Sequence, residues 1–243
     1  MCGRFNVTSD PLSQLLMDLV GLTHPGQDNF NLAPTERVHV VRVDDQGAPE
    51  VVAMRWWLTP FWAKELTAKY AMFNAKSETA AKSPAFREAY RRRRCVVPVS
   101  GFYEWAKAAK AGGPKTPYFI LPQQHEGMLL AGLWDSWRVP ASESGKAGLA
   151  EGEELLSFTI LTTAANESLK FVHARQPVML SPDEARQWLE VQTPTAALTH
   201  LFESRLPMEL TVLPVSSHVN NARNKDERCM QPLAAGQTIP ATH

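Results

Sequence analysis

The sequence predicts an α+β protein: a single compact domain in which mixed, mostly antiparallel β-sheets form a barrel-like core flanked by a few helices. Three observations lead to this fold class. Runs of β-branched and aromatic residues recur along the chain, only a few segments have a helical pattern, and neither a repeat nor a linker divides the sequence. With 243 residues, 44% of them hydrophobic, the chain can bury a substantial core.

Three segments are predicted to be helical. The first has its cap at Ser9 or Asp10 and Pro11 as its first helical residue, a position where proline is favoured. The second begins at Ser83 as cap and runs into the four arginines at 91–94, which are either a local basic patch or a solvated helix end, where cations are favourable. The third opens with SPDE, a cap followed by acidic residues. The predicted helices cover 11–20, 83–93 and 181–190.

Strands are predicted where β-branched and aromatic residues lie between turn residues. One of these strands contains Pro98 and Gly101, which is typical of a kinked or edge strand. Two polar segments, 106–117 and 138–154, are predicted to be exposed hairpin loops, and the second is long enough to be mobile. The predicted strands cover 38–43, 51–57, 95–105, 118–122, 127–137 and 155–163.

Composition limits the function classes. The 25 basic and 25 acidic residues give zero formal net charge, so a nucleic-acid partner would have to be recognised by local charge. No apolar run approaches the roughly 18 residues of a membrane helix, and the N-terminus lacks a signal-peptide pattern. The widely spaced Cys2, Cys95 and Cys229 indicate neither a disulfide framework nor a zinc cluster. We therefore expect a cytoplasmic monomer with no metal, cofactor or membrane partner.

The opening MCGRF places a cysteine directly after the initiator methionine. A free cysteine is usually buried and inert, but a small second residue permits removal of Met1. Cys2 would then carry an amine and a thiol on adjacent carbons, with the amine titrating near pH 8 and the thiol open to activation by a cation such as Arg4. Such a pair can condense with an aldehyde and close a thiazolidine ring, or the thiol can attack an amide.

Glu104 lies between Tyr103 and Trp105 in GFYEW. The simpler interpretation is a strand carboxylate that points to solvent. A carboxyl group in apolar surroundings has a raised pKa, however, and becomes a candidate general acid or base. Trp105 would offer a flat face on which an unpaired base can stack.

Three further segments contain candidate residues. Asn74 is either a turn residue or an amide that orients a substrate hydroxyl, and Lys76 shares its face in an extended chain. His173 is either a satisfied core residue or a proton donor, and the nearby cation Arg175 suits proton transfer close to phosphate. Trp62, in a loop-like stretch, is a candidate stacking platform.

Seven motifs occur in a characteristic order: MCGRF, NLAPT, WWLTPFW, NAKSET, RCVVPVSGFYEW, VHARQP and PVSSHVNN. With this ordered set the chain resembles the SRAP family, the SOS-response-associated peptidase-like proteins, whose members shield abasic sites in single-stranded DNA. The resemblance runs from Cys2 to about Asn224. It implies an SRAP-like domain over 2–230, followed by a C-terminal tail at 231–243.

The resemblance implies a mechanism. Cys2 would form an imine and then a thiazolidine with the open aldehyde of the abasic site, giving a DNA–protein crosslink that protects the strand. His173 would assist opening of the sugar ring, Glu104 would shuttle protons, and Asn74 would hold the Cys2 end and the opened sugar. Binding should weaken with salt and show no sequence preference. The implied phosphate contacts are Arg4, Lys76 and Arg175, and the implied base contacts are Trp62 and Trp105.

The chain departs from the family pattern at three places. Lys76 stands where the family commonly has arginine, so it offers a point charge and a weaker phosphate contact. Gln176 is neutral where the family often has methionine or arginine. The segment 138–154 lies outside the motif set and has no assigned role. Crosslinking also requires that Met1 is removed.

Two other functions stay open. Cys2 could be the nucleophile of an amidase or peptidase, including self-processing before the cysteine, although no matching glutamine-pocket pattern follows. A non-catalytic module would bind single-stranded DNA through the same basic and aromatic residues without a covalent product. Lyase-type activity at the lesion is a further expectation for the crosslinking protein.

Overall fold

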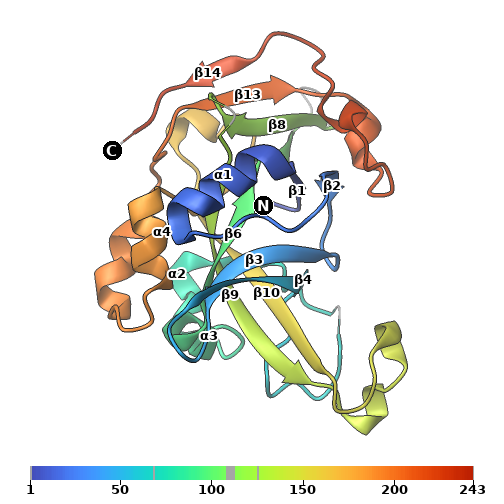
Figure 1. Cartoon of the computed structure of the whole chain (residues 1–243). Coiled ribbons are helices and arrows are strands. Elements are labelled where there is room, and N and C mark those ends of the chain that lie inside the picture. Colours follow the sequence, from blue (N-terminus) through green and yellow to red (C-terminus); the bar gives the residue numbers. More distant parts are fainter. Residues whose placement is uncertain (1, 68, 108–112, 125, 243) are drawn as a thin grey trace.

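The computed structural model describes residues 2–67, 69–107, 113–124 and 126–242, and it confirms the α+β fold with a barrel-like core (Figure 1). One sheet has eight strands and the other six. Within these residues, the strand pairs are antiparallel except those that β10 makes with β4 and β5. The strands are β1 (Arg4–Val7), β2 (Asn29–Leu32), β3 (Arg37–Val43), β4 (Pro49–Trp56), β5 (Asn74–Lys76), β6 (Arg94–Val99), β7 (Gly101–Ala106), β8 (Thr116–Pro122), β9 (Met128–Arg138), β10 (Glu154–Ala164), β11 (Arg175–Pro177), β12 (Met179–Leu180), β13 (Leu210–Pro214) and β14 (Gln237–Ile239).

Five strands of the larger sheet close into a barrel. Strand β3 pairs with β4 and β6, β6 with β9, and β9 with β10, which returns to β4 through Ser157 and Phe158. Side chains alternate between the two sides of the ring. Val40, Val97 and Phe158 belong to the interior cluster, whereas Val41 and its neighbours pack under the helices.

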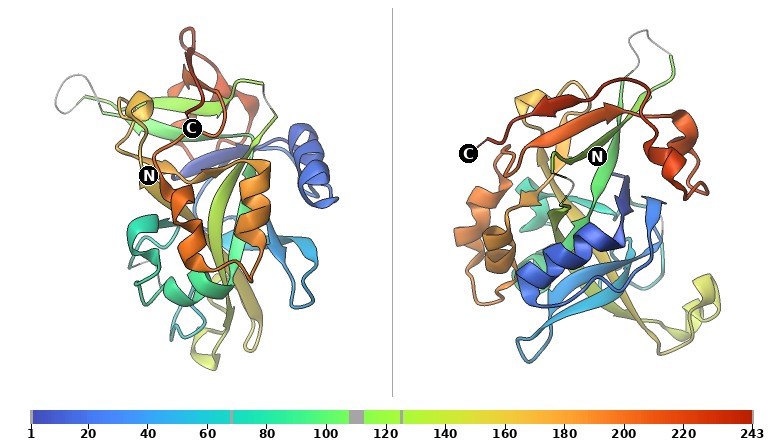
Figure 2. Two further views of the ribbon diagram at one scale, coloured as in Figure 1. Left: turned by 90° about the vertical axis from the view of Figure 1, so that its left-hand side faces the viewer. Right: turned by 45° about the horizontal axis from the view of Figure 1, so that its top comes forward.

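The six-stranded sheet has the order β14-β13-β8-β7-β1-β2 and lies against the barrel (Figure 2). Phe5, Phe102 and Val212 of this sheet belong to the same buried cluster as the barrel interior. Strand β14, from the segment expected to be a tail, pairs with β13, and Thr242 forms an isolated bridge with Leu206. Cys2, at the start of the chain, belongs to the same buried cluster as residues of both sheets and so lies between them.

The helices follow the predicted positions with shifted starts. The first begins at Ser9 with Thr8 at the N-cap position, so the prediction of Ser9 or Asp10 as cap and Pro11 as first helical residue is wrong. It ends at Val20 and is capped by Gly21, which has a left-handed φ of 73°. The third is confirmed, with the Ser181–Glu184 capping box in place. The prediction of Ser83 as a cap is wrong: its carbonyl closes a turn and the helix starts later. The α-helices are α1 (Ser9–Val20), α2 (Ser77–Ala80), α3 (Arg87–Arg92) and α4 (Pro182–Leu189).

Short 3₁₀ turns connect several of the strands and helices. Among the described residues, no helix is long and apolar enough to cross a membrane. The predicted loop 106–117 lies partly outside the described residues. The 3₁₀ turns are η1 (Ala141–Glu143), η2 (Lys146–Gly148), η3 (Glu167–Leu169), η4 (Thr195–Phe202), η5 (Ser217–Asn220) and η6 (Glu227–Met230).

The strand predicted at 95–105 is two strands in different sheets. The chain leaves the barrel after β6 and enters the smaller sheet as β7, with the kink at Ser100, whose hydroxyl accepts the Thr8 N–H at 2.9 Å. A Cβ at Gly101 would lie 2.5 Å from the Phe119 ring, so only glycine fits the crossing. This crossing carries Glu104 to the space between the sheets.

The four arginines at 91–94 are not uniformly solvated, which corrects the sequence interpretation. Arg91 is exposed, but Arg94 is buried. The Arg94 guanidinium donates to the carbonyl oxygens of Trp188, at 2.7 Å, and Glu190. These carbonyls lie at the carboxyl end of α4, where backbone acceptors lack partners within the helix.

Replacing Arg94 with alanine should lower the free energy of unfolding by roughly 2–4 kcal/mol, because buried carbonyl oxygens lose their donor. Urea denaturation measures the change. Arg91→Ala is the matched control and should change the same quantity by less than about 0.5 kcal/mol. Equal losses in the two variants would mean that helix-end charge, and not buried hydrogen bonding, is responsible.

Candidate functional site

Cys2 lies just before β1, next to the N-terminus marked in Figure 1. Its side chain is wholly buried in a cluster to which both sheets contribute. Its Sγ approaches the Arg4 carbonyl oxygen at 3.9 Å. Burial raises the pKa of the Cys2 thiol far above its ordinary value, and the negative charge of Glu104 raises it further. The expectation that Arg4 activates the thiol is therefore wrong: at neutral pH the thiol is protonated.

Asn74 fixes the position of Cys2 from the opposite sheet. It opens β5, which runs parallel to β10 with Asn74 beside Ile160. Its Nδ2 donates to the Cys2 carbonyl oxygen at 2.7 Å, and its Oδ1 is buried without a hydrogen-bond partner among the described residues. The amide thus links the two sheets and keeps one buried acceptor available.

Glu104 is turned inward, because alternate residues of β7 face opposite sides of the sheet. Phe102, two residues earlier, belongs to the cluster that contains Cys2, whereas Tyr103 belongs to a separate cluster on the other face. The Glu104 side chain is 6% exposed, and its Oε1 accepts the Trp105 N–H at 3.3 Å. The structure therefore favours a buried carboxylate beside Cys2 over a solvated strand residue.

His173 lies between η3 and β11, close to the Cys2 cluster through its neighbour Val172. The Arg175 backbone N–H donates to Nδ1 of His173 at 3.0 Å. An Nδ1 that accepts a hydrogen bond leaves the hydrogen of the neutral ring on Nε2. The half-buried imidazole can therefore donate a proton from Nε2.

Arg175 is held by an acid that the sequence analysis did not single out. Its two terminal nitrogens contact the Glu78 carboxylate at 2.6 and 3.0 Å. The hydrogen bonds from Arg175 lower the pKa of Glu78, and Lys76 lowers it slightly further. Glu78 lies two residues after Lys76 in NAKSET. Its negative charge, within a motif expected to bind phosphate through cations, was the sequence feature that could have indicated an ion pair. Lys76 itself is exposed.

Arg4 and Trp105 lie on the other face of the smaller sheet. The Arg4 guanidinium donates to Asn31 Oδ1 at 2.9 Å and to the Val219 carbonyl at 2.8 Å, and it lies 5.9 Å from the centre of the Trp105 ring. The Trp105 Nε1 donates to Asn220 Oδ1 at 2.7 Å. Burial lowers the pKa of Arg4. The fold places Arg4 next to Trp105, but on the opposite face of the sheet from the Cys2 thiol.

Trp62 lies in the connection between β4 and β5 and is 54% exposed. It lines a cavity of about 350 Å³ together with Tyr70 and Met72. None of the contacts described for Cys2, Glu104 or His173 involves Trp62. It is a separate exposed aromatic surface on the same protein.

In the part of the chain that the structure describes, no group of three or more His, Cys, Asp or Glu side chains could hold a metal ion. The three cysteines are free and buried. The groups described around Cys2 are its thiol, the Glu104 carboxyl group, the His173 imidazole and the Asn74 amide, with cations at the margin.

Comparison with known proteins identifies the family. A family model described as SOS response associated peptidase (SRAP) matches residues 1–222. The abasic site processing protein YoqW of Bacillus subtilis is 31% identical over 240 residues, covering 95% of this chain and 99% of that protein. The chain belongs to the SRAP family.

Other SRAP relatives agree. The abasic site processing protein HMCES of Gallus gallus is 32% identical over 224 residues, covering 82% of this chain and 62% of that protein. A protein of known structure from Bacteroides thetaiotaomicron superimposes with a TM-score of 0.75 at 21% identity, covering 96% of this chain and 100% of that one. At this identity the likeness concerns the fold alone.

Glu78→Gln should change the pH dependence of stability. Because Arg175 holds the folded-state pKa of Glu78 below its ordinary 4.5, the pair stabilises the wild type fully above pH 4.5 and loses this contribution as the pH falls through the lowered pKa. The difference in Tm between wild type and variant should be largest near neutral pH and should shrink below pH 4.5, as measured by scanning calorimetry. Glu151→Gln, at an exposed position, is the control and should not show this dependence on pH. A Tm difference between wild type and Glu78→Gln that stays constant with pH would contradict this account.

Proposed function

We propose that this SRAP protein captures abasic sites in single-stranded DNA covalently through Cys2, once Met1 has been removed. The names of the relatives, abasic site processing proteins, support the lesion as target. The observation that carries the proposal is the arrangement at Cys2: a residue fixed by Asn74, beside the buried carboxylate of Glu104. An N-terminal amine formed at this point would have acid–base groups around it.

The raised pKa of the Cys2 thiol sets the order of the bond-forming steps. A protonated thiol is a poor nucleophile, whereas an α-amine is partly neutral near pH 7. The amine attacks the aldehyde carbon first, and loss of one water gives the imine. The sulfur then adds to the imine carbon, and the thiol proton passes to the nitrogen. The product is a thiazolidine, with one water released overall.

His173 acts before the amine. An abasic sugar is mostly a closed hemiacetal, and opening it requires a proton at the ring oxygen while the hydroxyl proton leaves. The hydrogen on Nε2 of His173 suits this donation, since the Arg175 N–H occupies Nδ1. The opened sugar presents the aldehyde to the amine.

Glu104 acts on the two later steps. In imine formation it takes a proton that the amine nitrogen loses and gives it to the departing hydroxyl of the carbinolamine, and in ring closure it takes the thiol proton and passes it to the nitrogen. Asn74 adds a free Oδ1 that can accept a hydrogen bond from a hydroxyl of the opened sugar. Each role uses a group that is already held in position.

The cations and aromatic residues at the margin bind the strand. Lys76 is exposed and free to meet a phosphate, whereas Arg175 is shared with Glu78, so a phosphate there must compete with a carboxylate. Trp62 offers a stacking face away from Cys2, and Trp105 with Arg4 offers a second one. This distribution favours a strand that passes over the site and contacts several surfaces.

The amidase alternative is less well supported. A nucleophilic cysteine in amide hydrolysis needs a lowered pKa, and the Cys2 environment raises it. A binding module without covalent chemistry accounts for the cations and tryptophans but leaves the buried Glu104 without a role.

Methionine-free protein incubated with single-stranded DNA carrying one abasic site should give a heat-stable covalent product. Intact mass spectrometry should show the sum of the two masses minus one water. Cys2→Ala should give no such product, and a strand whose abasic aldehyde has been reduced to the alcohol should not react with the wild type. Equal affinity for intact and abasic strands without any covalent product would instead favour the binding module.

His173→Ala should slow crosslinking to an abasic site by on the order of 100-fold, because sugar opening loses its proton donor. An oligonucleotide with a linear alkyl aldehyde in place of the sugar needs no opening, so on this strand the variant should react at nearly the wild-type rate in quenched time courses. Glu104→Gln is the matched comparison and should slow both reactions. Equal slowing of both strands by His173→Ala would exclude the ring-opening role.

A further inference from the structure

The segment 57–73, which joins β4 to β5, carries three exposed aromatic side chains. Phe61, Trp62 and Tyr70 are 52%, 54% and 64% exposed. In its described residues the segment contains no helix or strand, yet it surrounds the 350 Å³ cavity that Met72 also lines. A long loop without secondary structure keeps a defined shape only when its backbone groups are bound by neighbours.

Side chains from β9, β10 and the connector between them bind successive backbone groups of this segment. Each of these side chains is almost fully buried. Together they form a row of hydrogen bonds along one side of the loop. The pairs are Thr59 N–H to Ser157 Oγ at 2.8 Å, Phe61 N–H to Asp135 Oδ2 at 3.1 Å, Trp137 Nε1–H to the Ala63 carbonyl at 2.7 Å, and Leu66 N–H to Glu143 Oε2 at 3.1 Å.

The first three of these side chains come from the regular sheet. Ser157 and Asp135 are register partners in the β9–β10 pair, and Trp137 is two residues further along the same face of β9. The fourth, Glu143, comes from the 138–154 connector, where it ends η1. The connector thus extends the row of hydrogen bonds beyond the end of the sheet.

Glu143 is built into this position. Its side chain is 4% exposed, and Lys146 Nζ lies 2.6 Å from its Oε1. The hydrogen bond from Lys146 lowers the pKa of Glu143, as does the Leu66 N–H. Leu66 also packs against the small apolar cluster that includes Leu149 of the connector. A buried carboxylate is costly unless it is paired, so these contacts indicate a fixed structure and not a loose loop.

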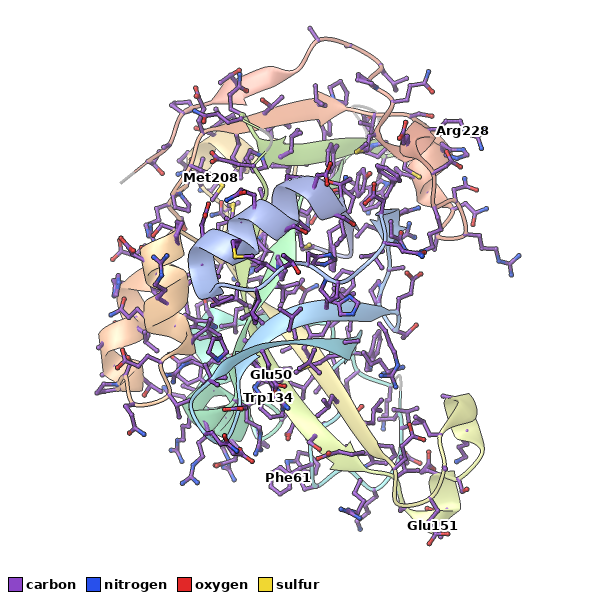
Figure 3. All side chains as sticks on the ribbon, viewed as in Figure 1. Glu50, Phe61, Trp134, Glu151, Met208 and Arg228 are labelled. Carbon is purple, nitrogen blue, oxygen red and sulfur yellow. The ribbon has the colours of Figure 1, made fainter. Side chains whose placement is uncertain are left out.

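The outer part of the connector is different. Figure 3 labels Glu151 on the connector, apart from Phe61 in that view, and Glu151 is exposed. The connector therefore has an inner side that holds the aromatic segment and an outer side in solvent.

We infer that the 138–154 connector positions Trp62 for stacking on a nucleobase of the strand that carries the abasic site, with Glu143 as its positioning residue. The inference rests on the proposed function, since single-stranded DNA is the ligand. Glu143 acts through the Leu66 backbone and not on the DNA. It fixes the loop before binding, which lowers the entropy that binding must remove.

Crosslinking at varied concentrations of abasic single-stranded DNA tests the inference. Glu143→Met keeps the side-chain length but accepts no hydrogen bond, and it should raise the half-saturating DNA concentration about 5-fold or more while the rate at saturation stays at the wild-type value. Glu143→Gln retains an acceptor and should behave as the wild type, as should the control Glu151→Gln. Trp62→Ala should reproduce the Glu143→Met shift.

A second measurement needs no DNA. In protein labelled with 5-fluorotryptophan, Glu143→Met should move or broaden the ¹⁹F resonance of Trp62, assigned by its loss in Trp62→Phe, and leave that of the buried Trp188 unchanged. An unchanged Trp62 resonance, or equal rises in half-saturation for Glu143→Met and Glu143→Gln, would overturn the inference. Absence of any crosslink in the wild type would overturn the proposed function, whereas the fluorine signal would still report whether Glu143 positions Trp62.

Discussion

The 2.7 Å hydrogen bond between Asn74 Nδ2 and the Cys2 carbonyl joins the beginning of the chain to the opposite sheet. The first residues of a domain commonly fray, and a frayed residue cannot serve a reaction that needs several groups in register. Here β1 is paired on both sides, with β2 and β7, and the Asn74 amide of β5 holds Cys2, two residues before the strand. The candidate chemistry at Cys2 depends on this restraint.

The packing of the two sheets around Cys2 separates a buried environment, which contains the thiol and Glu104, from a more exposed one, which contains the cations. On the inner face, burial keeps the Cys2 thiol protonated and Glu104 close to it. At the margin, Arg175 is neutralised by Glu78, while Lys76 remains in solvent. A chain with zero formal net charge can thus offer local positive charge without a basic surface over the whole molecule.

The sequence predicted the long, strongly patterned elements well and the short or long-range ones poorly. The helix at α4 carried its own capping box, and β9 and β10 carried long apolar runs, so local signals were sufficient. Strands as short as β5 and β11 depend on pairing with β10 and leave little local pattern. The interior position of Arg94 could not be predicted, because its acceptors belong to a helix about ninety residues later in the chain. Among the site residues, motif order brought Cys2, Asn74, Glu104 and His173 forward, but it did not tell which face of the sheet each would occupy, nor that Glu78 would hold Arg175.

The double pairing of β1 has a consequence for how this N-terminus can vary. Hydrogen bonds along both edges hold the register of the strand, with one irregularity opposite β2 between Phe5 and Val7. Cys2, two residues before the strand, is held separately by the Asn74 amide. One residue gained or lost between these two anchors would have to break the hydrogen bond at Cys2 or shift the pairing of β1, so the length of this spacer is constrained at both ends.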